Sequence, residues 1–210
     1  MRAHPVKCLI SGLIAAFCAV SVHADDIDAA TRAAAERIAV GTCAACHGWR
    51  GHSIAPKFPV LAGQRANYLL AQLQAFRAQT RGDPDALGYM YGMAAPLDDG
   101  MMAALAAYYS QQAPVSGERG DAGLLARGMQ LYQNGDTAEG IPPCAACHGP
   151  HGEGTDMFPR LAGQHVEYVM KQLRSFQSNL RNVAIMHGVA QGLRVGDMRA
   201  VATYLQSLGQ

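Results

Sequence analysis

The hexapeptide Cys-Ala-Ala-Cys-His-Gly occurs twice in this 210-residue chain, at 43–48 and at 144–149. Two thiols and an imidazole in this order can bind zinc, exchange disulfides or hold a covalently attached haem. A chance repeat of six residues is very improbable in a chain of this length. The surrounding sequence has to distinguish the three kinds of chemistry.

Neither zinc binding nor disulfide exchange fits the surroundings of the motifs. A tetrahedral zinc site takes four ligands, and neither half has a second cysteine pair. A thioredoxin-like dithiol lies at a strand end, and no stretch shows the sustained alternation of a strand. Cys-x-x-Cys-His is instead the attachment sequence for c-type haem, because one helical turn presents both thiols to the two vinyl groups. We predict two covalently attached haem c groups, held by Cys43, Cys46 and His47 and by Cys144, Cys147 and His148.

The first 24 residues have the layout of a secretory signal peptide. Arg2 and Lys7 precede an almost wholly apolar run over 8–20, which leads to a small residue, Ala24. We predict cleavage after Ala24 and export; an uncleaved anchor is the alternative, although the run is shorter than the roughly 20 residues that span a bilayer. The exported chain would keep four cysteines, all in the two motifs. Its charge is near zero, which argues against a nucleic-acid partner.

The hexapeptide belongs to a longer internal repeat. The string FPVLAGQ at 58–64 returns as FPRLAGQ at 158–164, and Tyr-x-x-x-Gln-Leu-x-x-Phe follows each copy. The offset between the halves then falls by four, so the first half carries four extra residues around 82–89. We predict four parts: a signal peptide over 1–24, an N-terminal domain over 25–112, a linker over 113–119 and a C-terminal domain over 120–210.

Both halves are predicted to be all-α. Apolar spacing and capping residues favour helices over 29–40 (ending at Gly41), 64–80, 98–112, 121–134, 164–180 and 195–208. Three helices in a domain of this size bury a modest core, which a large apolar cofactor would complete.

A sixth ligand to each iron would distinguish an electron carrier from an enzyme. Methionine closes the iron and favours electron transfer, whereas an open position permits substrate or peroxide chemistry. In the second half, Met186 is the only methionine between the middle and last helices. In the first half the repeat places Met90 opposite Met186, so we predict Met90, with Met93 as the alternative.

Other residues of the same types have simpler interpretations. His187 is a rival to Met186, but its counterpart in the repeat is Tyr91, which favours a place at the surface or behind the ligand. Core packing is expected for Met102, Met129, Met170 and Met198. Solvated loop or helix-start positions are expected for His52, His151 and His165.

Taken together, these motifs resemble those of a known protein family. The order of N-terminal helix, Cys-x-x-Cys-His, Pro-x-Leu, Met and C-terminal helix is similar to class I cytochrome c. Two copies, each with LAGQ, resemble the diheme cytochrome c4 family over essentially the whole chain after residue 24. The resemblance implies two tandem class I cytochrome c domains related by pseudo-two-fold symmetry. It also implies a periplasmic carrier of electrons to terminal oxidases, with loose membrane association.

The resemblance also assigns residues behind the ligands. In class I cytochromes a proline carbonyl accepts the Nδ1–H of the ligating histidine, and Pro59 and Pro159 match that position. Arg81 and Arg181 are placed either beside a haem propionate or in solvent as surface charges.

The leading hypothesis is an electron carrier without substrate chemistry of its own, with redox proteins as donor and acceptor. Both irons are expected to be closed by methionine, and no nucleophile, triad or carboxylate pair is recognisable. One alternative is a haem-bearing subunit of a periplasmic dehydrogenase, such as flavocytochrome c sulfide dehydrogenase. Another is a diheme cytochrome c peroxidase, which needs one iron with an open position.

Overall fold

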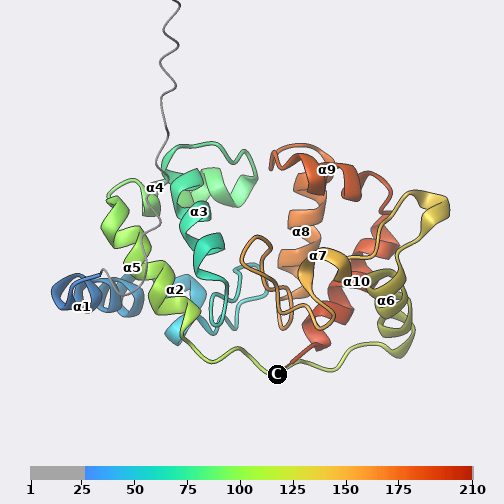
Figure 1. Cartoon of the computed structure of the whole chain (residues 1–210), viewed down its shortest axis with the longest axis horizontal. Coiled ribbons are helices and arrows are strands. Elements are labelled where there is room, and N and C mark those ends of the chain that lie inside the picture. The colour runs from blue at the N-terminus through green and yellow to red at the C-terminus, as the bar shows by residue number, and fades with distance from the viewer. Residues whose placement is uncertain (1–26, 210) are drawn as a thin grey trace, which may run out of the picture.

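The computed structural model describes residues 27–209, so the predicted signal peptide and its cleavage site lie outside the described residues (Figure 1). Within 27–209 the regular structure is helical, apart from an isolated bridge between Asp136 and Ile141. The predicted all-α class is confirmed. No helix in this range is long and apolar enough to cross a membrane.

The first haem motif is the last turn of a continuous helix. Asp28 caps α1 by accepting hydrogen bonds from two backbone N–H groups of the first turn. The helix then continues through a π-helical segment, with bounds α1 Ala29–Ile38, η2 Ala39–Cys43 and α2 Ala44–His47. The predicted end at Gly41 is therefore wrong. Gly41 is exposed, and a glycine inside an exposed helix costs only about 1 kcal/mol, which the packed flanking turns override.

The remaining helices of the first half surround an apolar core. The predicted helices 64–80 and 98–112 are present but shorter, as α3 Ala66–Arg77 and α5 Asp99–Ser110. Leu69 of α3 packs with Leu105 and Tyr109 of α5, and all three are buried. The segment that carries the predicted methionine ligand is also helical, as η4 Ala86–Met90 and α4 Tyr91–Ala94.

The second half repeats this arrangement with one difference. Its helices are α6 Ala122–Asn134, α7 Ala145–His148, α8 Val166–Gln177, α9 Ala184–Gln191 and α10 Val195–Ser207. Here α6 stops at Gly135, and a short segment that contains the 3-10 turn Thr137–Glu139 separates it from the motif helix α7. Gly128 lets α6 approach α10 closely, because a Cβ there would lie 2.1 Å from the carbonyl oxygen of Ala200.

The two halves lie side by side, and residues on α3 and α8 and in the loops before them meet between the halves (Figure 1). Two glutamines, at equivalent places in the repeat, make reciprocal contacts. Gln164 Nε2 donates to Val60 O at 2.9 Å, and Val60 N donates to Gln164 Oε1 at 2.7 Å. Gln64 Nε2 likewise donates to Arg160 O at 2.9 Å, and Arg160 N donates to Gln64 Oε1 at 2.7 Å. We call these two pairs of bonds the glutamine bridges; their reciprocity reflects the predicted pseudo-two-fold symmetry.

The segment between the halves packs against both of them. Gly63 and Gly163, the glycines of the two LAGQ strings, have positive φ angles of 68° and 75°. A Cβ on Gly63 would lie 2.5 Å from Pro114, and one on Gly163 would lie 2.5 Å from Val115. Glycine at these positions therefore permits both the turn and the close approach of residues 114 and 115.

Candidate haem sites

Each Cys-x-x-Cys-His motif presents two thiols and a buried imidazole at the end of a helical turn. The four cysteines are half-buried free thiols, and the side chains of His47 and His148 are buried. Burial raises the pKa of the Cys144 thiol to about 11 and also raises that of Cys43, so both thiols are protonated near neutral pH before any haem is attached.

Both histidines are held by the predicted proline carbonyls. His47 Nδ1–H donates to Pro59 O at 3.0 Å, and His148 Nδ1–H donates to Pro159 O at 3.0 Å. Burial lowers the pKa of both imidazoles and outweighs the carbonyl bonds, which act to raise it. A neutral ring with its proton on Nδ1 keeps the lone pair of Nε2 available for a metal. No hydrogen bond within 27–209 engages either Nε2 atom.

The loops after the motifs return in the same way in both halves. Gly51 O accepts hydrogen bonds from Leu61 N and Ala62 N, and Gly152 O accepts the equivalent pair from residues 161 and 162. Phe58 stands edge-on to the ring of His47, with ring centroids 6.2 Å apart, and the second half repeats this contact at 5.9 Å. Each proline is thereby placed opposite its histidine.

The methionines differ in burial. Met90 is half-buried and packs against Phe76, Ala86 and Ala94, whereas Met93 is 52% exposed. Met186 is half-buried in α9 and packs against the core cluster of the second half, which Cys144 also contacts.

The core expectation is confirmed for three of the remaining methionines, Met102, Met170 and Met198. It is wrong for Met129, which is 51% exposed because it lies on the outer face of α6.

One histidine expectation is right about the position and wrong about the solvent: His165 lies at the start of α8, as expected, but it is not solvated. His165 is buried between the halves, where its Nε2 is 2.9 Å from Ser53 O. The equivalent residue of the first half, Arg65, donates to Gly154 O, so an arginine and a histidine make the same cross-interface contact. His52 and His151 are exposed as expected. His187 is half-buried, with Nδ1 2.8 Å from Phe176 O.

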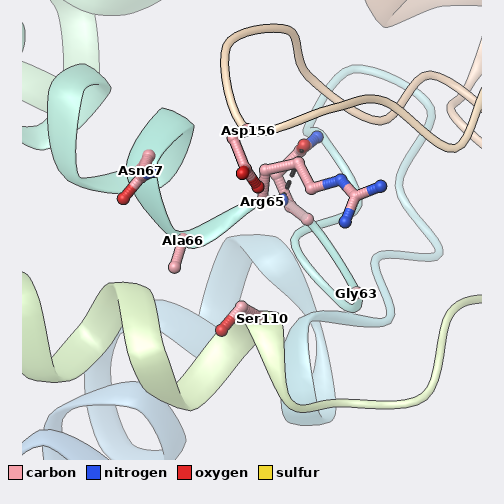
Figure 2. Close-up of a pocket in the computed structure, with 7 residues that line it drawn as sticks. Gly63, Arg65, Ala66, Asn67, Ser110 and Asp156 are labelled. Carbon is pink, nitrogen blue, oxygen red and sulfur yellow. Dashed lines mark hydrogen bonds between the residues drawn. The ribbon is translucent and has the colours of Figure 1, made fainter. Parts of the chain in front are cut away.

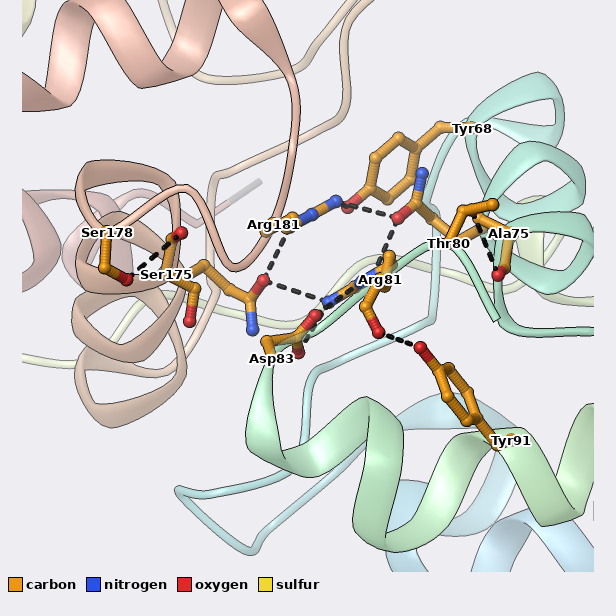
Figure 3. Close-up of polar contacts among 11 residues, drawn as sticks. Tyr68, Ala75, Thr80, Arg81, Asp83, Tyr91, Ser175, Ser178 and Arg181 are labelled. Carbon is orange, nitrogen blue, oxygen red and sulfur yellow. Dashed lines mark hydrogen bonds and ion pairs between the residues drawn. The ribbon is translucent and has the colours of Figure 1, made fainter. Parts of the chain in front are cut away.

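Arg81 and Arg181 lie in the interface between the halves, so the solvated-surface alternative is wrong (Figure 3). Arg81 pairs with Asp83 through hydrogen bonds of 2.8 and 2.9 Å, and both side chains are buried. Arg181 has no carboxylate partner among residues 27–209, and its Nε is buried without a hydrogen-bond acceptor. The two arginines share the side-chain oxygens of Gln72 and Gln172.

A separate polar pocket of about 190 Å³ opens beside the interface (Figure 2). Ser110 and Asp156 line it with the turn that leads into α3, and none of its lining residues belongs to a haem motif. It is distinct from the two candidate haem sites.

The donor set of each half fits haem c. Two thiols one helical turn apart would hold the vinyl groups, and a neutral imidazole and a half-buried thioether would supply iron ligands. The Nε–H of Arg181 is buried without an acceptor, and it would donate a hydrogen bond to a cofactor carboxylate.

Comparison with known proteins identifies the family. The cytochrome c family profile matches residues 33–112 and 125–209. A cytochrome c4 of Azotobacter vinelandii is 42% identical over 191 residues, covering 86% of this chain and 90% of that protein. The chain belongs to the cytochrome c4 family. Reduced recombinant cytochrome c4 from Pseudomonas stutzeri has a crystal structure that matches with a TM-score of 0.75 and 40% identity, over 85% of this chain and 98% of that one.

The name of a further relative states the enzyme from which that protein accepts electrons. The thiosulfate dehydrogenase electron acceptor of Thiomonas intermedia is 36% identical over 172 residues, covering 78% of this chain and 77% of that protein. As a cytochrome c4, the chain consists of two tandem cytochrome c domains with two covalently bound haem c groups, and it carries electrons between redox proteins.

Proposed function

We propose that this protein is a periplasmic carrier that delivers electrons to a terminal oxidase and has no substrate chemistry of its own. The observation that carries the proposal is the matched pair of sites, each with a proline-held neutral histidine and a half-buried methionine. Closed irons suit electron transfer and exclude substrate from the metal. The proposal includes export by residues 1–24 and the division into domains over 25–112 and 120–210, joined by 113–119.

We propose the following ligands. The first haem is bound by Cys43, Cys46, His47 and Met90, and the second by Cys144, Cys147, His148 and Met186; Pro59 and Pro159 orient the two histidines. The exposure of Met93 and the packing of Met90 against Phe76 support Met90 over Met93 in the first half.

The haem iron, when bound, supplies reversible one-electron transfer. The chain keeps each imidazole neutral and in one orientation, because Nδ1–H is bonded to a carbonyl in a buried loop. The surrounding apolar cores limit water around the two sites.

A second candidate is the electron acceptor of a periplasmic dehydrogenase. The name of the Thiomonas relative supports this role, and a flavoprotein such as sulfide dehydrogenase would be a comparable donor. A diheme peroxidase would require one open iron, which the matched methionines argue against.

A redox titration with optical spectra tests the ligands. We expect methionine-to-iron charge-transfer absorption from both oxidised haems. Met90→Ala should remove one of the two contributions, whereas Met93→Ala should keep both. Loss in Met93→Ala alone would reverse the assignment, and absence of one contribution in the wild type, together with hydrogen-peroxide turnover, would support the peroxidase.

Purification from the native cell tests the partner and the location. The carrier should purify alone from the periplasmic fraction, begin at Asp25 and reduce an oxidase directly. Stoichiometric co-purification with a dehydrogenase would support the second candidate instead.

A further inference from the structure

Gln164 in the second half binds the loop that orients His47 in the first half. Gln164 is 6% exposed, and its amide satisfies both backbone polar groups of Val60, at 2.7 and 2.9 Å. Val60 directly follows Pro59, whose carbonyl accepts Nδ1–H of His47 at 3.0 Å. The side chain of Gln164 in one half is therefore connected, through Val60 and Pro59, to the candidate iron ligand His47 in the other half.

The reverse connection has the same geometry. Gln64 is 6% exposed and satisfies both backbone polar groups of Arg160, at 2.7 and 2.9 Å. Arg160 directly follows Pro159, whose carbonyl accepts Nδ1–H of His148 at 3.0 Å. The two connections cross the interface in opposite directions.

The position of each proline carbonyl depends on these bridges. Proline has no N–H, so its carbonyl is its only backbone polar group, and its placement follows that of its neighbours. Val60 is buried, and removing the Gln164 amide would leave its N–H and C=O without their partners, which makes movement of the loop favourable. Such movement would lengthen the bond from His47 to Pro59.

We propose that Gln164 and Gln64 are positioning residues, each of which tunes the haem of the opposite half through the proline carbonyl. The proposal rests on the histidine ligation proposed above. A strong bond from Nδ1–H makes the imidazole more basic, and a more basic ligand stabilises the oxidised iron. Loss of a glutamine bridge therefore raises the reduction potential of the haem across the interface.

The test is a crossed pair of substitutions in the haem-loaded protein. Gln164→Met keeps the volume and removes the hydrogen bonds, and Gln64→Met is its counterpart in the other half. We expect Gln164→Met to raise the equilibrium constant for reduction of the first haem by up to about tenfold. For one electron, this corresponds to a reduction potential about 59 mV higher. Gln64→Met should do the same to the second haem.

A cross-interface control separates this effect from a loosened interface. Asp85→Asn breaks the ion pair with Lys171 of the other half and leaves both glutamine bridges in place. The lost charge acts on the first haem, in the half that carries Asp85, so the potential of the second haem should stay within experimental error. Each potential is assigned to its haem through Met90→Ala and Met186→Ala. If Gln164→Met does not assemble, the shorter Gln164→Asn should give the same pattern.

The inference is overturned if each substitution changes the haem of its own half, changes both haems equally, or changes neither. These outcomes would leave the proposed function intact as long as the wild type shows two methionine-ligated haems. Absence of those two signals would instead refute the proposed ligands.

Discussion

The buried ion pair of Arg81 and Asp83 provides a test of how much burial contributes to the stability of the interface. The Arg81 and Asp83 side chains are 7% and 3% exposed, at a separation of 2.8 Å. Asp83→Ala would leave a buried guanidinium without its counter-charge, a change that costs about 3–5 kcal/mol. Gln72 and Gln172 still accept hydrogen bonds from Arg81, so we expect the low end, about 3 kcal/mol.

The same half contains a matched exposed pair. Arg77 and Asp99 form an ion pair with side chains 36% and 76% exposed. Exposed pairs contribute about 0–1 kcal/mol, so Asp99→Ala should cost less than 1 kcal/mol. Urea unfolding of the oxidised, haem-loaded protein, followed by circular dichroism, measures both variants. Equal losses for Asp83→Ala and Asp99→Ala would refute the reasoning, because burial is the property in which the two pairs differ most.

Two further substitutions test the packing, and a change of pH tests the buried carboxylate of Asp83. Gly128→Ala places a Cβ where Ala200 O stands 2.1 Å away, so thermal unfolding should report a loss of at least about 2 kcal/mol; an unchanged midpoint would contradict the helix crossing. Tyr132→Phe removes the hydroxyl that donates to Gly149 O at 2.5 Å, which should cost about 1.5 kcal/mol by urea unfolding. Burial acts to raise the pKa of Asp83, but the hydrogen bond and charge of Arg81 outweigh it and hold that pKa below its usual value. The stability from this carboxylate is therefore present above about pH 4 and is lost as the pH falls through the lowered folded pKa, so wild type and Asp83→Ala should converge in strong acid.

Much of the fold could be predicted because the chain contains its pattern twice. Apolar spacing located the middle and last helices of both halves to within a few residues. It missed α4 and α9, whose few turns are too short for a clear period and depend on packing against their neighbours. It also placed a helix end at Gly41, because the π-helical segment shifts the spacing between α1 and the motif.

The residues of the site also fall into those that the sequence predicts and those that it does not. Local spacing was enough for the cysteines and histidines, whereas the two prolines came from the resemblance to class I cytochromes c; the structure brings each histidine to its proline. The interface roles of His165 and Asp83 were missed, because contacts between halves about a hundred residues apart leave no local pattern. One signal was available: Gln64 and Gln164 are the polar residues of the two LAGQ strings, and a repeated polar residue beside small and apolar ones indicates a specific hydrogen bond.

The packing of residues 114 and 115 against the paired glycines has a kinetic consequence. Gly63 and Gly163 bring the connecting peptide into contact with both halves, so the halves have no need to find each other by diffusion. We therefore expect electron exchange between the two haems to be a step at one set distance, because the halves do not separate. Its rate should be independent of solvent viscosity, unlike that of two domains on a free tether. Bulky residues at the two glycines would convert the protein into such a tethered pair, with exchange that slows in glycerol.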